Sequence, residues 1–462
     1  MSKRNIKIAI PLILILGLGI LTFIRWNAWF GNPEEPAYTT EKKIGRLTLT
    51  LGNQGEYSRA FSWVFGEEVS QGTLYLTKVG SQDTTTIPAK CDVCPSRSGK
   101  SAYFRAFADQ LDHGSTYSYQ VRNGDIASEW HQFNTLADST KESFSFLYFG
   151  DIQDSDSSDY TRRVMNEIYD QNKETQFVLL GGDFIERPMD MYYNMAYDGL
   201  GRMATEVPIL AVTGNHEYLK GIVRKIDSRF AYAFPYYLAS KVKENHVFTF
   251  TYGNAQFFLL DSNREFWNLS DQREWLEAEM AKSTAKWMIV VLHHPIYSLR
   301  GGLNNFFVKQ NFQSAVEGGK TLKKIDLVLQ AHEHGYARKR TPMTDGKSTT
   351  PLYSVSYFSD KAYFQSFDGD YERWGTANRY YQKISINGDS LFFRTYTDQH
   401  ELYDEVILCY NDSDKRATLA IDKAQEIPEK VIVPDWFRQV KGEKKTKKYE
   451  QSIQEWKEKK GK

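Results

Sequence analysis

The sequence predicts an α/β protein in two folded parts, a small antiparallel β-sandwich followed by a larger α/β domain. Residues 45–135 contain six short runs in which apolar and polar residues alternate, separated by turn residues, which is the pattern of a β-sandwich. From residue 144 onward, short apolar runs alternate with longer helical stretches. That second pattern is typical of buried, partly parallel strands packed against helices.

The amino terminus predicts a membrane anchor. Residues 8–24 form an apolar run without a charged residue, and Lys3, Arg4 and Lys7 precede it. Such a run is at the short end of what spans a bilayer as a helix, and bulky aromatic residues follow it in place of a small-residue cleavage site. We therefore expect residues 1–30 to be an uncleaved signal-anchor. It would make the protein single-pass in the cell membrane, with the folded parts outside the cytoplasm. A cleaved signal peptide, which would give a secreted protein, and a buried soluble helix are the alternatives.

The remaining chain divides at polar segments. We expect a β-sandwich over 42–136, an α/β domain over 143–400 and a charged C-terminal extension over 401–462. Short polar linkers at 31–41 and 137–142 precede the sandwich and the α/β domain. Residues 441–462 contain nine lysines and four glutamates. The spacing of Tyr449, Ile453 and Trp456 permits an amphipathic helix there, but a solvated basic tail is the favoured interpretation.

Within the α/β domain the elements follow from the apolar pattern. Strands are expected at residues 144–149, 177–180, 208–212, 257–261, 287–292 and 326–330, and helices at 159–171 and 270–281. The dipeptide Asn387-Gly388 between two alternating runs predicts a β-hairpin.

Charge and cysteine content exclude several classes of protein. Lysine plus arginine and aspartate plus glutamate each total 58, so the basic excess of a nucleic-acid-binding surface is missing. Three cysteines cannot build a disulfide scaffold. Cys91 and Cys94 are expected to form one disulfide outside the cytoplasm, with unpaired thiols as the alternative. The oligomeric state stays open.

Polar residues follow five of the expected strands directly. The five segments are Gly150–Asp154, Gly181–Glu186, Gly214–Glu217, His293–Pro295 and Ala331–His334. Five of the nine histidines of the chain lie in them. Any one segment alone could be a helix cap or a turn. Because residues at the carboxyl ends of parallel strands meet in one crevice, the five together predict a single metal-rich site.

The order of these motifs resembles that of the calcineurin-like metallophosphoesterase superfamily. The segment from Leu111 to Tyr119, followed by Phe133-Asn134-Thr135, is similar to the fibronectin type III-like domain that precedes the catalytic domain of purple acid phosphatases. The two resemblances cover about residues 42–400. They imply a metallophosphoesterase β-sandwich flanked by helices, preceded by a small all-β fibronectin type III-like domain.

The resemblance also implies a set of functional residues. Two metal ions would be bridged by Asp183. The first would bind Asp151, His334 and Gln153, and the second Asn215, His293 and His332. His216 would be the catalytic histidine near the leaving group, and Glu186 and His294 would lie behind the ligands. Nitrogen and oxygen ligands without cysteine suit Mn, Fe, Zn or Co, with the identity left open.

Two residues depart from the family pattern. Purple acid phosphatases have a tyrosine three residues after the bridging aspartate, where this chain has Glu186, so a tyrosinate–iron colour is not expected. Gln153 stands where most of the superfamily has histidine. An amide oxygen is a weaker ligand than imidazole, and the first metal site is therefore expected to be looser.

These residues predict an extracytoplasmic phosphoesterase with a dinuclear metal site. Two metal ions can activate a water and clamp the phosphoryl oxygens, and His216 can donate a proton because imidazole titrates near neutrality. Attack of the metal-bound hydroxide on a phosphomonoester is the leading hypothesis, and the substrate would be a small-molecule, lipid or glycan phosphate ester. A phosphodiesterase acting on lipid, glycan or nucleotide esters and a non-catalytic surface binding module are the alternatives. Residues expected at the rim of the substrate cleft are Tyr297, Asn304, Asn305, Tyr336 and Arg338.

Overall fold

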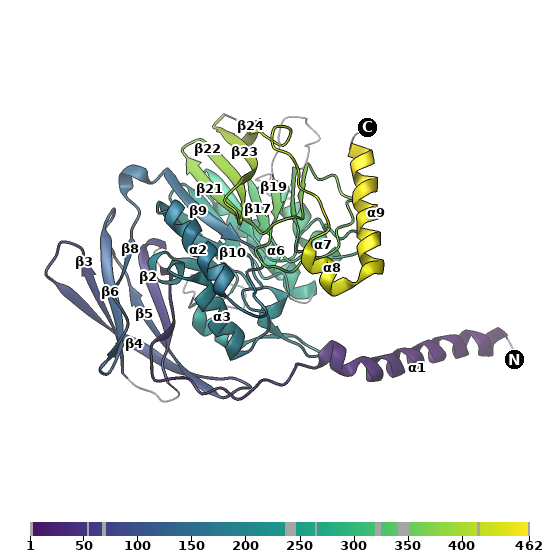
Figure 1. The fold of residues 1–462 in the computed structure, drawn as a ribbon, viewed down its shortest axis with the longest axis horizontal. Coiled ribbons are helices and arrows are strands. Elements are labelled where there is room, and N and C mark those ends of the chain that lie inside the picture. Colours follow the sequence, from purple (N-terminus) through teal and green to yellow (C-terminus); the bar gives the residue numbers. More distant parts are fainter. Residues whose placement is uncertain are drawn as a thin grey trace.

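The computed structural model describes residues 3–52, 55–66, 71–235, 246–263, 266–318, 325–340, 351–413 and 416–460, without the side chains of 3–14, 266–267 and 416. Figure 1 shows a β-sandwich beside a larger domain of sheets and helices, with the N-terminal helix projecting away from both. This arrangement confirms the predicted fold class.

Eight strands form the N-terminal sandwich. They are β1 (Gly45–Gly52), β2 (Gly55–Val64), β3 (Gly72–Lys78), β4 (Thr84–Pro95), β5 (Lys100–Ala108), β6 (Thr116–Asn123), β7 (Ile126–Ala127) and β8 (His131–Asn134). The long strand β4 pairs with β3 through its first half and with β5 through its second half, which joins the two sheets. Trp63, Phe104 and Tyr119 fill the core between them. Apolar and polar residues alternate in these strands because every second side chain of a strand faces the core.

The expected disulfide between Cys91 and Cys94 is wrong. Both cysteines lie in β4, and no disulfide joins them. Their side chains point to opposite faces of the strand because they are three residues apart. Cys94 is buried, and its Sγ lies 3.2 Å from Ser228 Oγ.

The larger domain contains two seven-stranded sheets. The first has the order β11-β10-β9-β21-β22-β23-β24 and the second β14-β15-β16-β17-β19-β18-β20. The first sheet comprises β9 (Ser143–Phe149), β10 (Thr175–Leu180), β11 (Ile209–Ala211), β21 (Tyr380–Asn387), β22 (Ser390–Thr397), β23 (Leu402–Asn411) and β24 (Arg416–Asp422). The second comprises β14 (Phe248–Tyr252), β15 (Ala255–Leu259), β16 (Trp287–Val291), β17 (Leu327–Gln330), β18 (Tyr336–Arg340), β19 (Leu352–Val355) and β20 (Arg373–Gly375). Each predicted strand and the hairpin at Asn387-Gly388 are present.

The two sheets pack face to face and helices cover their outer sides. Phe146 and Phe177 of the first sheet contact Phe257 of the second, with ring centroids 5.3 Å apart in both pairs. Helices α2 (Asp159–Gln171), α3 (Asp190–Leu200) and α4 (Met203–Glu206) pack with the first sheet, and α6 (Phe266–Lys282) and α7 (Phe306–Val316) with the second. The short elements η1 (Asp138–Thr140), η2 (Asn215–Glu217), β12 (Tyr218–Leu219), β13 (Lys225–Ile226) and α5 (Ser228–Ala233) lie in the connections. The continuous apolar runs of strands such as β16 follow from this layering, because both of their faces are buried.

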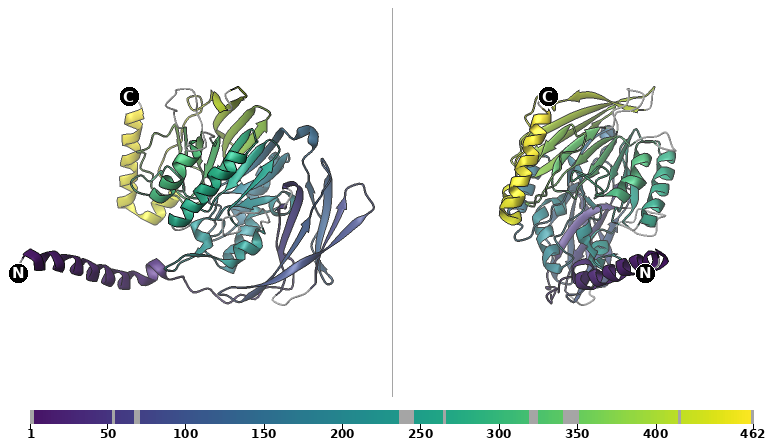
Figure 2. Two further views of the ribbon diagram at one scale, coloured as in Figure 1. Left: turned by 180° about the vertical axis from the view of Figure 1, so that it is seen from behind. Right: turned by 90° about the vertical axis from the view of Figure 1, so that its right-hand side faces the viewer.

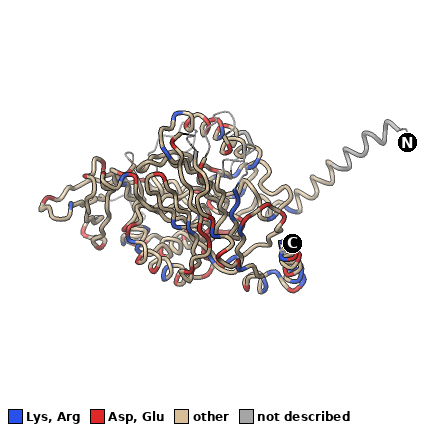
Figure 3. Tube along the Cα trace, turned by 90° about the horizontal axis from the view of Figure 1, so that it is seen from above, with Lys and Arg blue, Asp and Glu red and all other residues tan. Residues whose placement is uncertain are grey.

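The C-terminal part is more ordered than a solvated tail. Residues 402–411 and 416–422, assigned to the extension by the sequence, form β23 and β24 of the first sheet. Helices α8 (Asp435–Lys441) and α9 (Glu443–Lys460) follow, and Figure 2 shows both lying against the α/β domain. Tyr449 and Ile453 are buried. Basic and acidic residues are interspersed along the outer part of α9 (Figure 3). The amphipathic helix, and not the favoured basic tail, is therefore correct.

The N-terminal helix α1 (Lys3–Phe30) contains the predicted signal-anchor. Side chains of residues 3–14 lie outside the described part, and beyond them apolar side chains such as Leu16, Leu18 and Phe23 are exposed. Among the residues that the structure describes, no helix combines the length and apolar character required to cross a membrane. The anchor stays a prediction.

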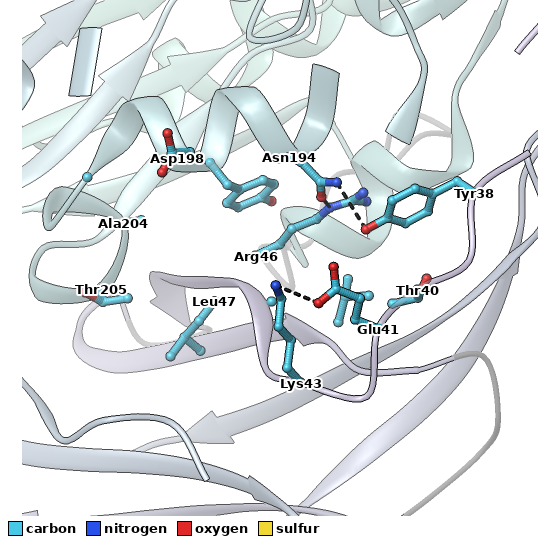
Figure 4. A pocket seen from close by; sticks show the side chains of 14 residues that line it. Tyr38, Thr40, Glu41, Lys43, Arg46, Leu47, Asn194, Asp198, Ala204 and Thr205 are labelled. Atoms are coloured by element: carbon cyan, nitrogen blue, oxygen red, sulfur yellow. Dashed lines mark hydrogen bonds and ion pairs between the residues drawn. The ribbon is translucent and has the colours of Figure 1, made fainter. Parts of the chain in front are cut away.

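The β-sandwich and the α/β domain meet at Arg46. Its guanidinium donates to Asp190 Oδ1 at 2.7 Å and to Asn194 Oδ1 at 2.8 Å, and Asn194 in turn donates to the Tyr38 hydroxyl at 3.1 Å. Figure 4 shows Arg46, Asn194 and Tyr38 beside a cavity that both domains line, with a volume of about 470 Å³. The ion pair between Arg46 and Asp190 is almost completely buried, so separating the two domains would leave both charges without partners.

A second buried arginine fixes the segment expected to be a linker. Arg229 binds Glu35 at 2.6 Å, Asp227 at 2.7 Å and Asp190 at 2.9 Å. Glu35 belongs to residues 31–41, which precede the sandwich in the sequence. The chain before the sandwich is thus bound to the α/β domain, close to the site described next.

Candidate metal centre

The five predicted motifs converge at the carboxyl ends of strands from both sheets. Strands β9, β10 and β11 run parallel in one sheet, and β15, β16 and β17 run parallel in the other. The motif residues follow β9, β10, β11, β16 and β17, so they all lie at the same end of the domain. The structure therefore brings together the residues that the sequence predicted from strand ends alone.

Asp151, Asp183 and His334 form the first cluster. Each offers one nitrogen or oxygen atom, and these atoms lie within 4.8 Å of one another. Gln153 is completely buried beside them, and its Nε2 lies 3.5 Å from His334 Nε2. This is the group of residues that the sequence assigned to the first metal ion.

His293, His294 and His332 form the second cluster, again with one atom of each within 4.8 Å of the others. The Nε2 atom of His293 lies 3.4 Å from Asn215 Oδ1 and 3.3 Å from Asp183 Oδ2. Asp183 thus lies between the two clusters, as a bridging ligand must. His294, expected behind the ligands, lies among them with its Nδ1 3.0 Å from Ser262 Oγ.

The donor atoms are arranged as a cation would require. Asp151 Oδ1 and Gln153 Oε1 are buried and have no hydrogen-bond partner among the described residues. The Nδ1 atoms of His293 and His334 lie 2.9 and 3.1 Å from the carbonyl oxygens of Gly181 and Lys361. A carbonyl oxygen can only accept, so each Nδ1 carries the proton and each Nε2 is left to bind a metal. These residues fit two metal ions.

Strained backbone marks the same residues. Asp151, Asp183, His332 and His334 have φ angles of 43°, 49°, 73° and 45°. Residues other than glycine adopt this left-handed region at a cost of about 1–3 kcal/mol each, and such strain concentrates at functional sites. The strained conformation of these four residues lowers the stability of the fold, and it directs their side chains toward the same centre.

Burial and charge set the protonation of the cluster. Burial lowers the pKa of His334 to about 3 and also lowers the pKa of His332, which keeps both imidazoles neutral and able to bind a cation. Burial would raise the pKa of Asp183, but the facing His293 and His216 hold it well below its usual value. Burial likewise opposes protonation of His293, yet Asp183 raises its pKa to about 9, so a metal ion at Nε2 would displace a proton there.

His216 lies beside the two clusters and is partly accessible. Its Nε2 is 3.9 Å from Asp183 Oδ2, and its backbone N–H donates to Asp183 Oδ1 at 2.8 Å. The Nδ1 atom donates to the carbonyl oxygen of Glu186. This bond leaves the other ring nitrogen to face the two clusters.

Glu186 has a partner that the sequence did not predict. Its carboxylate forms a buried ion pair with Lys361, whose carbonyl oxygen accepts from His334. The pair therefore connects the residue that orients His216 with the residue that orients His334. No motif of the sequence indicated Lys361.

Glu217 is the second residue that the sequence analysis missed as functional, although it lies inside the predicted Gly214–Glu217 segment. It is completely buried, and its carboxylate accepts from four backbone N–H groups. These belong to Gly214 at 2.6 Å, Phe184 at 2.8 Å, Asp183 at 3.0 Å and Ile185 at 3.3 Å. One side chain thus ties the loop after β10 to the loop after β11. The sequence signal that could have identified Glu217 is its position as a charged residue next to predicted ligands.

Two cavities open on the centre. One of about 590 Å³ is lined by Asp183, Asn215, His216 and His332 together with Arg300, Asn304, Tyr363, Phe364, Phe437, Lys441 and Lys445. The other, about 340 Å³, shares Asn215 and His216 with it and includes Arg97, Arg187 and Arg224 in its lining. Of the expected rim residues, Asn304 lines the larger cavity. Tyr336 and Arg338 are buried instead and bind Asp404.

Comparisons with known proteins agree with the two domains described above. Residues 144–336 match the calcineurin-like phosphoesterase family, and residues 45–135 match the purple acid phosphatase N-terminal domain. The chain is 24% identical to purple acid phosphatase 21 of Arabidopsis thaliana over 45% of its own length and 47% of the relative's. It is 26% identical to phosphoenolpyruvate phosphatase of Allium cepa over 50% and 49% of the two lengths. The chain thus spans about half the length of these two curated relatives.

Solved structures show the same fold. The purple acid phosphatase PPD1 from yellow lupin (Lupinus luteus) seeds superposes with a TM-score of 0.65 at 15% identity, covering 81% of this chain and 76% of that one. PhoD superposes with a TM-score of 0.57 at 14% identity, covering 93% and 100%. The chain thus combines a domain that matches the calcineurin-like phosphoesterase family with a domain that matches the purple acid phosphatase N-terminal family, and it has the fold of a purple acid phosphatase.

Proposed function

We propose that this protein hydrolyses phosphate monoesters at a site that holds two metal ions. The observation that carries the proposal is the convergence of the predicted ligands in two clusters, with Asp183, Asn215, His332 and His216 lining a cavity of about 590 Å³. A non-catalytic binding module would not require every one of these side chains. The relatives named as phosphatases support the same reaction class.

Different residues of the chain would bind the metal ions and transfer the proton. Asp151, Gln153 and His334 would hold one ion, and Asn215, His293 and His332 the other, with Asp183 between them. When bound, two such ions lower the pKa of a water and neutralise charge on the phosphoryl oxygens. Phosphoryl transfer needs mainly positioning and charge stabilisation, and the fixed backbone of the four strained residues supplies the positioning.

His216 is proposed to donate a proton to the leaving oxygen. Its Nδ1 is held by the carbonyl oxygen of Glu186, so Nε2 is the atom that would carry the transferred proton. The side chain is partly accessible, with 23% of it exposed, and it lines both cavities. A leaving group in either cavity would therefore lie next to it.

A paired assay tests the proposal. The chain is incubated with Mn, Zn, Fe or Co and given 4-nitrophenyl phosphate or bis(4-nitrophenyl) phosphate. We expect metal-dependent hydrolysis of the monoester. Cleavage of the diester with little turnover of the monoester would favour the phosphodiesterase instead. Bound metal without turnover of either ester would contradict the proposal. Location outside the cytoplasm and attachment to a membrane through residues 1–30 stay predictions of the sequence.

Replacing His216 separates proton transfer from metal binding. We expect His216→Ala to lower kcat by about 10²–10⁴-fold, the usual contribution of a general acid, while the metal content of the protein stays unchanged. The loss should be larger for an alkyl phosphate than for 4-nitrophenyl phosphate, because nitrophenolate leaves without a proton. Metal content by mass spectrometry and kcat for both esters are the measurements. Loss of metal in this variant would make His216 a ligand and overturn its assigned role.

A further inference from the structure

The larger cavity at the metal centre has a wall that belongs to the C-terminal extension. Phe437 and Lys441 of α8 and Lys445 of α9 line it, opposite His216. These residues lie outside both matched family segments, 45–135 and 144–336. The family resemblance therefore does not explain what they do there.

The extension is held firmly in this position. Phe437, Tyr449 and Ile453 are buried in a hydrophobic cluster with Leu299 and Trp374 of the α/β domain. Phe437 and Tyr449 pack with ring centroids 5.0 Å apart. Burial of aromatic side chains of this kind fixes a helix on its domain. The lysines on α8 and α9 thus have a defined place beside the centre.

The turn between the two helices brings both lysines to the same cavity. Lys441 is the last residue of α8, and α9 begins at Glu443. Gly442 between them has a φ angle of 78°, which glycine adopts without a steric cost. Lys445, in the first turn of α9, therefore returns to the cavity that Lys441 lines.

The cavity wall carries positive charge that no ion pair among the described residues neutralises. Arg300 lies over the Tyr363 ring, 5.5 Å from its centroid, and interacts electrostatically with Glu333, and Lys441 lies over the Trp436 ring, 5.0 Å from its centroid. Arg300 joins Lys441 and Lys445 in the lining. Within the described part of the chain, none of the ion pairs involves any of these three residues, although Arg438 and Lys460 of the same extension are paired with Glu450 and Glu429. Among the described lining residues the one acid is Asp183, which is a predicted metal ligand.

We propose that Lys441, Lys445 and Arg300 form a subsite for a second anionic group, so that the preferred substrate is a phosphate ester whose leaving group carries a carboxylate or a further phosphate. The inference rests on the proposed phosphatase function. The scissile phosphate would lie at the metal ligands, with the leaving oxygen at His216 and the rest of the leaving group extending toward the three cations. The aromatic residues Tyr363, Phe364 and Phe437 line the same cavity.

Three matched esters test the subsite. Phenyl phosphate has an uncharged leaving group, 4-carboxyphenyl phosphate adds a carboxylate to the same ring, and 1,4-phenylene bisphosphate adds a phosphate. Each is compared between the wild type and the double variant Lys441→Gln/Lys445→Gln, so that differences in leaving-group reactivity cancel. The control is Lys444→Gln/Lys459→Gln, which removes the same charge from two exposed lysines of α9 that do not line the cavity.

We expect the Lys441→Gln/Lys445→Gln variant to lower kcat/KM for the two charged esters about tenfold, as the loss of two partly exposed charge contacts implies. Its kcat/KM for phenyl phosphate should change less than about twofold, and the control should change none of the three by more. The ester with the larger loss identifies carboxylate or phosphate as the preferred group. Equal losses on all three esters, or no loss on any, would overturn the inference.

Equilibrium binding separates this inference from the proposed function. If the wild type hydrolyses none of the three esters, the phosphatase proposal fails, and calorimetry with the same compounds then tests the subsite. Weaker binding of 1,4-phenylene bisphosphate, with unchanged binding of phenyl phosphate, in the Lys441→Gln/Lys445→Gln variant would support the subsite. Equal affinities of wild type and variant for the bisphosphate would refute it.

Discussion

Replacing Asp183 by asparagine is expected to reduce phosphatase activity by about 10³-fold, because metal ions contribute several kcal/mol of charge stabilisation and each 1.36 kcal/mol is tenfold in rate. The Asp183 side chain lies between the two histidine-containing clusters, with Oδ2 3.3 Å from His293 Nε2. Oδ1 also accepts the backbone N–H of His216 at 2.8 Å. An amide at this position removes the shared negative charge. Both metal occupancy and the placement of His216 should suffer.

Gln153→Ala is the informative comparison. Gln153 is a predicted neutral ligand beside one cluster, and its loss should cost only about tenfold in activity, within the range for residues that support a metal site. Asp159→Asn is a matched control, because Asp159 is an exposed aspartate at the start of α2. The measurements are kcat/KM and metal content, with a chelator-treated wild type as the blank. Similar residual activity in Asp183→Asn and Gln153→Ala, with both folded, would refute the bridging assignment.

Replacing Glu217 by alanine is expected to destabilise the protein by at least about 4 kcal/mol, because each of four buried donors left without a partner costs about 1–3 kcal/mol. Four backbone N–H groups would lose their acceptor at once, at distances of 2.6 to 3.3 Å in the wild type. Because these groups belong to the loops that carry Asp183 and Asn215, activity should fall as well. The result would show that Glu217 acts by positioning the ligands.

Glu217→Gln tests that mechanism with little change in volume. Its amide oxygen can accept from some of the four N–H groups, but its NH₂ group cannot accept, so an intermediate effect is expected. Thermal unfolding of the chelator-treated protein reports stability without the contribution of bound metal, and metal titration of the folded variant reports ligand placement. A melting temperature and metal affinity unchanged in Glu217→Ala would contradict the positioning role.

The sequence predicted the strands and ligands for a local reason. An apolar run followed by aspartate, asparagine or histidine encodes both a buried strand and the residue at its end, as for Leu180 and Asp183. The alternation of apolar and polar residues likewise encoded the N-terminal sandwich. Such patterns depend only on residues that are neighbours in the sequence, and therefore they can be recognised without knowledge of the fold.

Other features depended on contacts between distant segments. A basic composition suggested a solvated tail after residue 441, yet Tyr449 is buried against aromatic residues of the α/β domain. Lys361 lies 175 residues from its partner Glu186, and no spacing rule relates such positions. Cys91 and Cys94 were close in sequence, but their geometry in β4 placed them on opposite faces.

The sequence by itself determined the two-part architecture, the motif order and the residues proposed to bind metal, because each follows from a strand and the few residues after it. Only the tertiary structure decided the surroundings of those residues. It showed that Glu217 fixes two ligand loops, that Lys361 pairs with Glu186, and that the C-terminal helices place Lys441 and Lys445 at the cavity. These relations arise when packing of the two sheets and their helices brings separate segments together, and no local pattern records that packing.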